Sequence, residues 1–347
     1  MTDALHSRYI INGCPQEFTP AELLDAVSET KSQPAPVEPQ SIIDESLDAE
    51  IGQYEWRESR IPAYRKKVSA ISAALPVPFA GVYSCARVAT ALIDSIWRQG
   101  RFRLDDLVLT AKWTWNGASV GNMAAFYDSV RSTADYIDAL HLNLRRFSFA
   151  EGEPDVKFAT PFSGAPEIVG GKILPREDSW LVYVPFDTAD YRLGGSLLAQ
   201  AEGRSGGISP QISDADYFVD CYEVVRELAE DGIILGGVTV GEGGLARALD
   251  SLCSGVCGAC VDIAGIMSSC EESNPVRVLF GEVPGALFQI ADSDFDYIDA
   301  EFLLQDVAWF PLGHPDLKTT EVEVNTSAKT TIQTILETLM QNAEGED

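Results

Sequence analysis

Residues 180–186, Trp-Leu-Val-Tyr-Val-Pro-Phe, form a short and almost entirely apolar run. Such a run is typical of a strand buried on both faces of an α/β sheet. Glycine loops and helical patterns follow it along the chain. They are a loop at 193–196 before a helix, a helix over 215–232 and a glycine-rich run at 236–244 before another helix. This alternation predicts an α/β (α+β) fold for the second half of the chain.

Apolar spacing also predicts regular structure in the first half. The expected elements are a helix starting at Pro20 with Thr19 as N-cap, mostly helical structure over 41–67, a buried helix over 83–97, strands over 107–113 and 156–162, and a long helix over 121–142. Nearer the C-terminus we expect paired strands at 276–280 and 286–290 and a helix from 319 to about 340. The proline-rich segment 32–39 is typical of a stiff linker.

The chain has 347 residues, with 53 Asp and Glu against 25 Lys and Arg, for a net charge of −28. A surface this acidic repels phosphate backbones, so the composition argues against a nucleic-acid partner. No apolar run approaches about 18 residues, so we expect no membrane-spanning helix and no membrane partner. The N-terminus has no basic-then-apolar signal pattern, which makes the cytoplasm the expected location.

The seven cysteines include the spacing Cys253-x3-Cys257-x2-Cys260. This spacing matches the cluster-binding motif of radical SAM enzymes. The interpretation that we favour is that these are buried cysteines at a helix end, with Gly255 and Gly258 ending the helix. We therefore expect no metal site and no disulfide framework.

Two glycine loops are candidate ligand sites. Gly194, Gly195 and Ser196 place N–H groups and a hydroxyl before a helix, and Arg192 is within reach, which predicts phosphate or anion binding. The alternative is that the glycines only permit a tight turn and that Ser196 caps the helix. The loop Glu242-Gly243-Gly244 is a candidate substrate loop, with a carboxylate able to hold a cation.

The order of segments 190–200, 242–249, 255–258 and 279–290 resembles the synthetase half of phosphoribosylformylglycinamidine synthase, in the aminoimidazole ribonucleotide (AIR) synthetase-related superfamily. The resemblance covers about residues 80–315. It implies a PurM-like module of two subdomains at 61–176 and 177–318, after an extension and linker at 1–60 and before a C-terminal helix and acidic tail at 319–347. It further implies a homodimer, in which the first sheet pairs with a second copy, through about residues 80–165 that include Lys112 and Trp113.

In the resembling family, ATP and Mg²⁺ bind between the subdomains and drive C–N ligation in purine biosynthesis. The resemblance implies that Leu92 and Ile96 stand where the family has metal ligands, and neither side chain can bind Mg²⁺; Asp94 lies between them on another face of the helix. The 238–242 loop lacks the family's His and first Asp, and 143–148 replaces a Gly-Lys-Asp-Ser loop. We therefore assign no catalytic residue.

Two hypotheses remain open. The first is a catalytically degenerate module, a pseudoenzyme, that keeps a nucleotide-binding or phosphate-binding loop and has a binding or assembly role. The second is an active ATP-dependent synthetase of the formylglycinamidine ribonucleotide synthase type. We expect no glutaminase domain in this sequence. The second hypothesis therefore needs free ammonia or a partner glutaminase as the source of nitrogen. A partner synthetase subunit is a further expectation.

Overall fold

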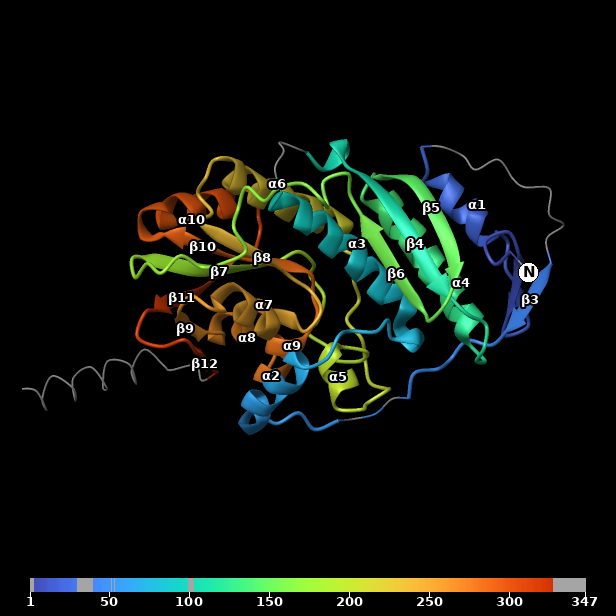
Figure 1. The fold of residues 1–347 in the computed structure, drawn as a ribbon, viewed down its shortest axis with the longest axis horizontal. Coiled ribbons are helices and arrows are strands. Elements are labelled where there is room, and N and C mark those ends of the chain that lie inside the picture. Colours follow the sequence, from blue (N-terminus) through green and yellow to red (C-terminus); the bar gives the residue numbers. More distant parts are fainter. Residues whose placement is uncertain (1–2, 30–39, 51, 53, 99–102, 327–347) are drawn as a thin grey trace, which may run out of the picture.

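The computed structural model describes residues 3–29, 40–50, 52, 54–98 and 103–326 (Figure 1). The strands are β1 (Arg8–Ile11), β2 (Cys14–Pro15), β3 (Ser41–Asp44), β4 (Val108–Trp115), β5 (Asn143–Glu151), β6 (Asp155–Ala159), β7 (Ser179–Pro185), β8 (Gly236–Val240), β9 (Gly258–Asp262), β10 (Gly285–Ala291), β11 (Phe310–Asp316) and β12 (Val322–Asn325). The α-helices are α1 (Pro20–Ala26), α2 (Ile61–Ser69), α3 (Ala80–Ile96), α4 (Asn122–Ala139), α5 (Leu197–Ala201), α6 (Ala215–Glu230), α7 (Gly244–Cys253), α8 (Ala264–Ser269), α9 (Pro275–Phe280) and α10 (Phe295–Leu304).

The largest sheet has six strands in the order β12-β9-β11-β7-β10-β8. Its central strands β7 and β10 are antiparallel and buried on both faces. Leu181 and Tyr183 pack into the core beneath α7, whereas Val182 and Val184 pack into the core that includes α3 and α6. This confirms the buried strand expected at 180–186, because a strand covered on both faces needs apolar side chains at consecutive positions.

A second sheet has three strands in the order β5-β4-β6, with β4 parallel to β5 and antiparallel to β6. Along β4, Trp113 and Trp115 are fully buried and Lys112 is exposed. The Trp113 indole N–H donates to Ser129 Oγ of α4 at 3.0 Å. Helix α3 lies between this sheet and the six-stranded sheet (Figure 1). It therefore joins the two halves of the core.

The N-terminal residues add a small sheet in the order β2-β1-β3 and helix α1. The predicted helix start is confirmed: Thr19 Oγ1 accepts the Glu22 N–H at 3.3 Å, and the Glu22 carboxylate accepts the Thr19 N–H at 2.7 Å. At the end of β3, the Asp44 carboxylate accepts the N–H groups of Gly121 and Met123, each at 2.8 Å, at the start of α4. The expected linker at 32–39 lies outside the described residues.

Several expected elements are different in the structure. Residues 276–280, expected as a strand, lie in helix α9, because Pro275 begins the helix and Asn274 Oδ1 accepts the Val276 N–H at 3.0 Å. Residues 143–148, expected as a loop, lie in strand β5. Between 41 and 67 the structure has strand β3 and then helix α2 from residue 61, rather than mostly helix. After residue 319 it has strand β12, and most of the expected helix lies beyond the described residues.

Helix α3 is the most apolar long helix of the described chain. The segment Val77–Ile96 is long and apolar enough to cross a membrane, but 67% of it is buried inside the fold. It packs against α4, β6 and β8, so its apolar character is explained by its place in the core.

Candidate functional site

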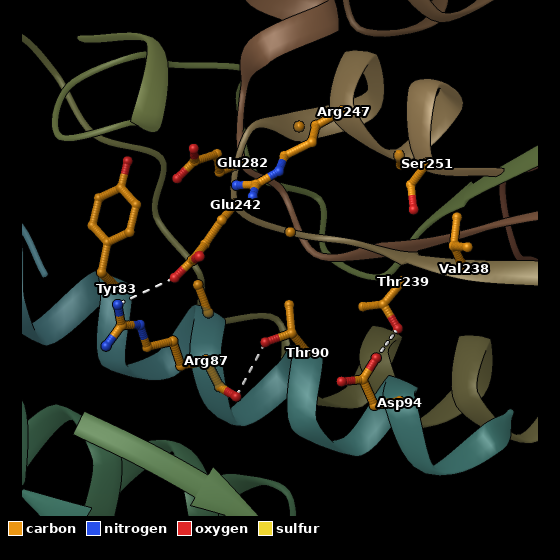
Figure 2. Close-up of a pocket in the computed structure, with 14 residues that line it drawn as sticks. Tyr83, Arg87, Thr90, Asp94, Val238, Thr239, Glu242, Arg247, Ser251 and Glu282 are labelled. Atoms are coloured by element: carbon orange, nitrogen blue, oxygen red, sulfur yellow. Dashed lines mark hydrogen bonds and ion pairs between the residues drawn. The ribbon is translucent and has the colours of Figure 1, made fainter. Parts of the chain in front are cut away.

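A cavity of about 330 Å³ lies between α3 and the segment that joins β8 to α7. We call it the central cavity (Figure 2). Its polar lining side chains are Tyr83, Arg87, Thr90 and Asp94 on one wall and Thr239, Glu242, Arg247, Ser251 and Glu282 on the other.

One wall of the central cavity is a single face of α3. Tyr83, Arg87, Thr90 and Asp94 are spaced by four, three and four residues, which aligns them along one side of an α-helix. Leu92 and Ile96 lie on the core side and are only 0% and 4% exposed. In the resemblance these two residues replace the family's metal ligands, and neither of them lines the central cavity.

Arg87 is the main polar link between the two walls. Its guanidinium forms an ion pair with Asp155 of β6, donates to the Val156 carbonyl oxygen at 2.9 Å and reaches Glu242 Oε1 at 3.1 Å. The Arg87 side chain is only 17% exposed, so these contacts replace lost hydration. Arg87 thus connects the three-stranded sheet to the β8–α7 segment.

Asp94 also has a partner across the central cavity. The Thr239 hydroxyl donates to Asp94 Oδ1, and the Trp97 indole N–H donates to Thr239 Oγ1 at 3.0 Å. Burial raises the pKa of Asp94, while the hydrogen bond from Thr239 opposes this rise. The Asp94 carboxylate is therefore engaged with protein groups rather than presented freely to a ligand.

Glu282 follows α9 and is 4% exposed. Its Oε1 accepts two backbone N–H groups, from Leu197 and Gly243, each at 2.7 Å. Burial raises the pKa of Glu282 to about 7, and the two N–H groups oppose this rise. This carboxyl therefore connects both glycine loops that the sequence singled out.

Arg247 projects from α7 into the central cavity on the same wall as Glu242 and Glu282 (Figure 2). In the part of the chain that the structure describes, no carboxylate forms an ion pair with Arg247. Its guanidinium is therefore available to an anionic group that enters the cavity.

The residues predicted as ligand sites are divided among several environments. Arg192 and Gly194 line a different cavity, whereas Glu242 and Gly244 line the central one. Gly195 has φ +80° and packs tightly against Phe79 and Tyr83.

The two remaining predicted residues have structural partners. Ser196 is buried as the N-cap of α5, where its Oγ accepts the Ala199 N–H at 3.2 Å and donates to the Leu193 carbonyl oxygen at 2.9 Å. Gly243 is the N-cap of α7 with φ +86°, and its N–H donates to Glu282. Anion binding by the 194–196 loop stays a prediction, and the first α5 amide N–H, that of Leu197, already has a carboxyl partner.

Sequence reasoning missed Arg87, Asp94, Thr239, Arg247 and Glu282 as members of one site. One signal was available, namely the polar residues at helical spacing on the otherwise apolar α3. The others come from β8, α7 and the segment after α9, and only folding brings these segments together.

The interpretation of the cysteine motif as buried residues at a helix end is confirmed for Cys253 and Cys257 but wrong for Cys260, and Gly258 begins strand β9 rather than ending the helix. Helix α7 ends at Cys253, Gly255 has φ +78°, and Cys253 and Cys257 are buried. Cys260 is exposed on strand β9. Among the described residues, no group of three or more His, Cys, Asp or Glu side chains is arranged to hold a metal ion.

Comparison with known proteins gives one family model match, over residues 179–299, to the family described as AIR synthase related protein, C-terminal domain. The probable phosphoribosylformylglycinamidine synthase, chloroplastic/mitochondrial, of Arabidopsis thaliana is 25% identical over 255 residues, which cover 69% of this chain and 18% of that protein. The human phosphoribosylformylglycinamidine synthase is 22% identical over 227 residues, which cover 61% of this chain and 17% of that protein. The chain thus spans less than a fifth of the length of these relatives.

Solved structures show the same fold. Thermotoga maritima PurL complexed with FGAR superposes with a TM-score of 0.53 at 13% identity, over 73% of this chain and 42% of that chain. PurL of the same organism complexed with AMPPCP gives 0.51 at 12% identity, over 73% and 41%. The expected PurM-like fold is confirmed. Residues 179–299 of this chain thus match the AIR synthase related protein, C-terminal domain, and the chain shares the fold of the PurL structures.

Proposed function

We propose that this chain is a catalytically degenerate, AIR synthase-related module that binds a small anionic metabolite in the central cavity, with a role linked to purine biosynthesis. One observation carries the proposal: the cavity carboxylates already have protein partners, whereas the Arg247 guanidinium forms no ion pair with any residue that the structure describes. Thr239 bonds Asp94, Arg87 pairs with Glu242, and two backbone N–H groups bond Glu282. A ligand with a phosphate or carboxylate group would gain a charge-assisted bond to Arg247.

The donor set does not fit a Mg²⁺ ion that bridges ATP phosphates. Mg²⁺ needs carboxylate oxygens free to point at it in octahedral geometry. In the described chain no suitable cluster of such side chains is present, and moving Asp94 or Glu242 toward a metal would break its bond to Thr239 or Arg87. We therefore derive no phosphoryl-transfer step for this chain.

Calorimetry on the purified chain tests the proposal, with ATP in the presence and absence of Mg²⁺ and with FGAR, the compound in the PurL complex, as probes. We expect any binding of ATP to be independent of Mg²⁺, and FGAR to bind with an affinity that falls about tenfold in Arg247→Gln, the loss of one charge-assisted contact. Arg131→Gln, in an exposed ion pair with Asp128, is the matched control.

The alternative is an active ATP-dependent synthetase that uses ammonia or a partner glutaminase. Magnesium-dependent ATP binding, together with phosphate release in the presence of FGAR and ammonia, would establish this alternative and overturn the degenerate module. No binding of either probe would overturn the ligand-binding role and leave assembly as the function of the fold.

We further propose a homodimer through the outward face of the three-stranded sheet. Lys112 of β4 lies opposite Ser148 of β5 and Lys157 of β6, and all three side chains are exposed. Trp113, which was expected in the same interface, is fully buried on the other face of β4 because successive side chains of a strand alternate.

Partner synthetase or glutaminase subunits and a cytoplasmic location stay predictions.

A further inference from the structure

A second cavity, of about 440 Å³, lies where the segments around residues 54–56, 192–194 and 206–208 meet α9. We call it the arginine cavity, because its charged lining side chains are Arg192 and Arg277. It shares no lining residue with the central cavity, whose lining includes three carboxylates, and no carboxylate is among its own lining residues. In a chain of net charge −28, this cavity is a place where two guanidinium groups face one hollow.

Both guanidinium groups keep donors for a ligand. Arg192 donates to Asp190 Oδ2 at 2.7 Å, and Arg277 donates to Glu272 Oε2 at 3.1 Å. Within the described residues each guanidinium uses one nitrogen in these pairs, although a guanidinium carries five N–H groups. The Asp190 side chain is 71% exposed, so its pairing with Arg192 is weak and easily exchanged for a better-placed anion.

The remaining walls come from backbone and from aromatic rings. The Gly194 N–H donates to the Ile208 carbonyl oxygen at 2.8 Å, and a Cβ on Gly194 would lie 2.5 Å from the Ile208 carbonyl carbon. The two segments therefore pack backbone to backbone. Tyr54 and Trp56 supply an apolar wall beside the two arginines.

A third arginine adds positive charge behind the aromatic wall. The Arg204 guanidinium lies 3.9 Å from the centre of the Trp56 ring and 4.7 Å from that of Tyr54. Its Nη1 is buried and has no hydrogen-bond partner among the residues that the structure describes. The Arg204 charge therefore lies next to the cavity wall, where it adds to the attraction for an anionic ligand, although the Glu202 carboxylate also interacts with it.

We propose that the arginine cavity binds a small organic phosphate, a phosphomonoester whose phosphate group contacts Arg192 and Arg277 and whose organic part packs on Tyr54 and Trp56. Guanidinium groups match phosphate oxygens in planar, paired hydrogen bonds, and this suits a dianionic phosphate better than a single carboxylate. The site is independent of the central cavity and of any ligand that binds there.

The test is a calorimetric titration of the full chain with phenyl phosphate, inorganic phosphate and phenol. We expect saturable binding of phenyl phosphate, weaker binding of inorganic phosphate and none of phenol, because the charge anchors the ligand and the ring adds contact area. The double variant Arg192→Gln/Arg277→Gln is expected to weaken phenyl phosphate binding at least tenfold. Arg176→Gln, in an exposed pair with Asp178, is expected to leave it unchanged.

A second variant tests the site by blocking the cavity rather than by removing an arginine charge. Ile208 lines the arginine cavity and is 59% exposed, so Ile208→Trp fills the cavity from its rim without touching the core. It is expected to block phenyl phosphate while the midpoint of urea unfolding stays that of the wild type. Equal phenyl phosphate affinity in the wild type, the double variant and Ile208→Trp would overturn the proposal, as would the absence of saturable binding. Loss of binding in Arg247→Gln alone would move the ligand to the central cavity and overturn it as well.

Discussion

Glu282 accepts the backbone N–H of Gly243 at 2.7 Å, so a buried carboxyl occupies the start of α7, where the sequence predicts a loop for substrate. The same oxygen accepts the N–H of Leu197 at the start of α5. One side chain after α9 therefore fixes two loops on the wall of the central cavity. Asp44 plays the corresponding part at the start of α4, where its carboxylate accepts the Gly121 N–H. Internal carboxyl groups satisfy helix N-termini that would otherwise attract external anions.

Replacing Glu282 is expected to change how stability depends on pH. Its pKa is raised from 4.5 to about 7 in the folded chain, so the folded state keeps a proton that the unfolded state releases. This contribution to stability is fully present below about pH 4.5 and is lost as the pH rises through about 7. Glu282→Gln keeps a neutral acceptor for the two N–H groups. Urea unfolding at pH 5, 6, 7 and 8 should show the wild type losing stability relative to this variant as pH increases.

The exposed Glu177 provides the control for this titration. Glu177→Gln makes the same chemical change at an exposed position and is unfolded in parallel over the same pH range as the comparison. A constant difference in unfolding free energy between Glu282→Gln and the wild type would show that Glu282 is ionised throughout this range and would contradict the prediction.

Gly195→Ala is expected to destabilise the fold by about 2 kcal/mol, because a side chain there must adopt a strained backbone and displace neighbouring rings. Gly195 has φ +80°, and its Cβ would lie 2.8 Å from ring atoms of Phe79 and Tyr83. Gly164→Ala is the control, because a Cβ at Gly164 meets nothing within 4 Å. Chemical denaturation of both variants measures the difference, and equal stability of the two would show that the 194–196 loop adapts freely.

Arg87→Gln should lower the free energy of unfolding by about 1–3 kcal/mol, because it leaves the half-buried Asp155 carboxylate and the Val156 carbonyl oxygen without their donor. The exposed pair of Arg131 and Asp128 should contribute less than about 1 kcal/mol, so Arg131→Gln serves as the comparison. Thermal unfolding of the two variants distinguishes these values. Equal small losses would mean that the contacts of Arg87 do not hold the two halves of the core together.

Ser148→Trp is expected to convert a dimer into a monomer without loss of fold. Ser148 is exposed on β5 opposite Lys112, so a bulky side chain there protrudes from the outward face of the sheet. Ser148→Ala should leave the assembly unchanged. Light scattering coupled to size-exclusion chromatography gives the mass of each. A monomeric wild type, or a dimer that survives Ser148→Trp, would remove this face from the interface.

Patterns within single segments were predictable from the sequence. Thr19 with Glu22 specified a helix start, and the apolar run at 180–186 specified a strand covered on both faces, because both signals act over a few neighbouring residues. Prediction of secondary structure from a short apolar run was wrong where the run suits a strand and a helix equally well. The run at 276–280 became a helix because Asn274 and Pro275 cap its start, and the two capping residues lie outside the run itself.

The candidate site was predictable only in fragments. The order of the glycine loops indicated the resemblance to the superfamily. The sequence also singled out the loop of Glu242 and Gly244, and both residues line the central cavity. The sequence by itself determined these local conformations and the apolar faces of each element, because propensity, capping and periodicity are properties of adjacent residues. Only the tertiary structure decided that Asp94 meets Thr239, that Arg87 reaches Glu242 and that Glu282 bonds Gly243. Those contacts join positions 145, 155 and 39 residues apart, and their geometry follows from how the sheets and helices pack.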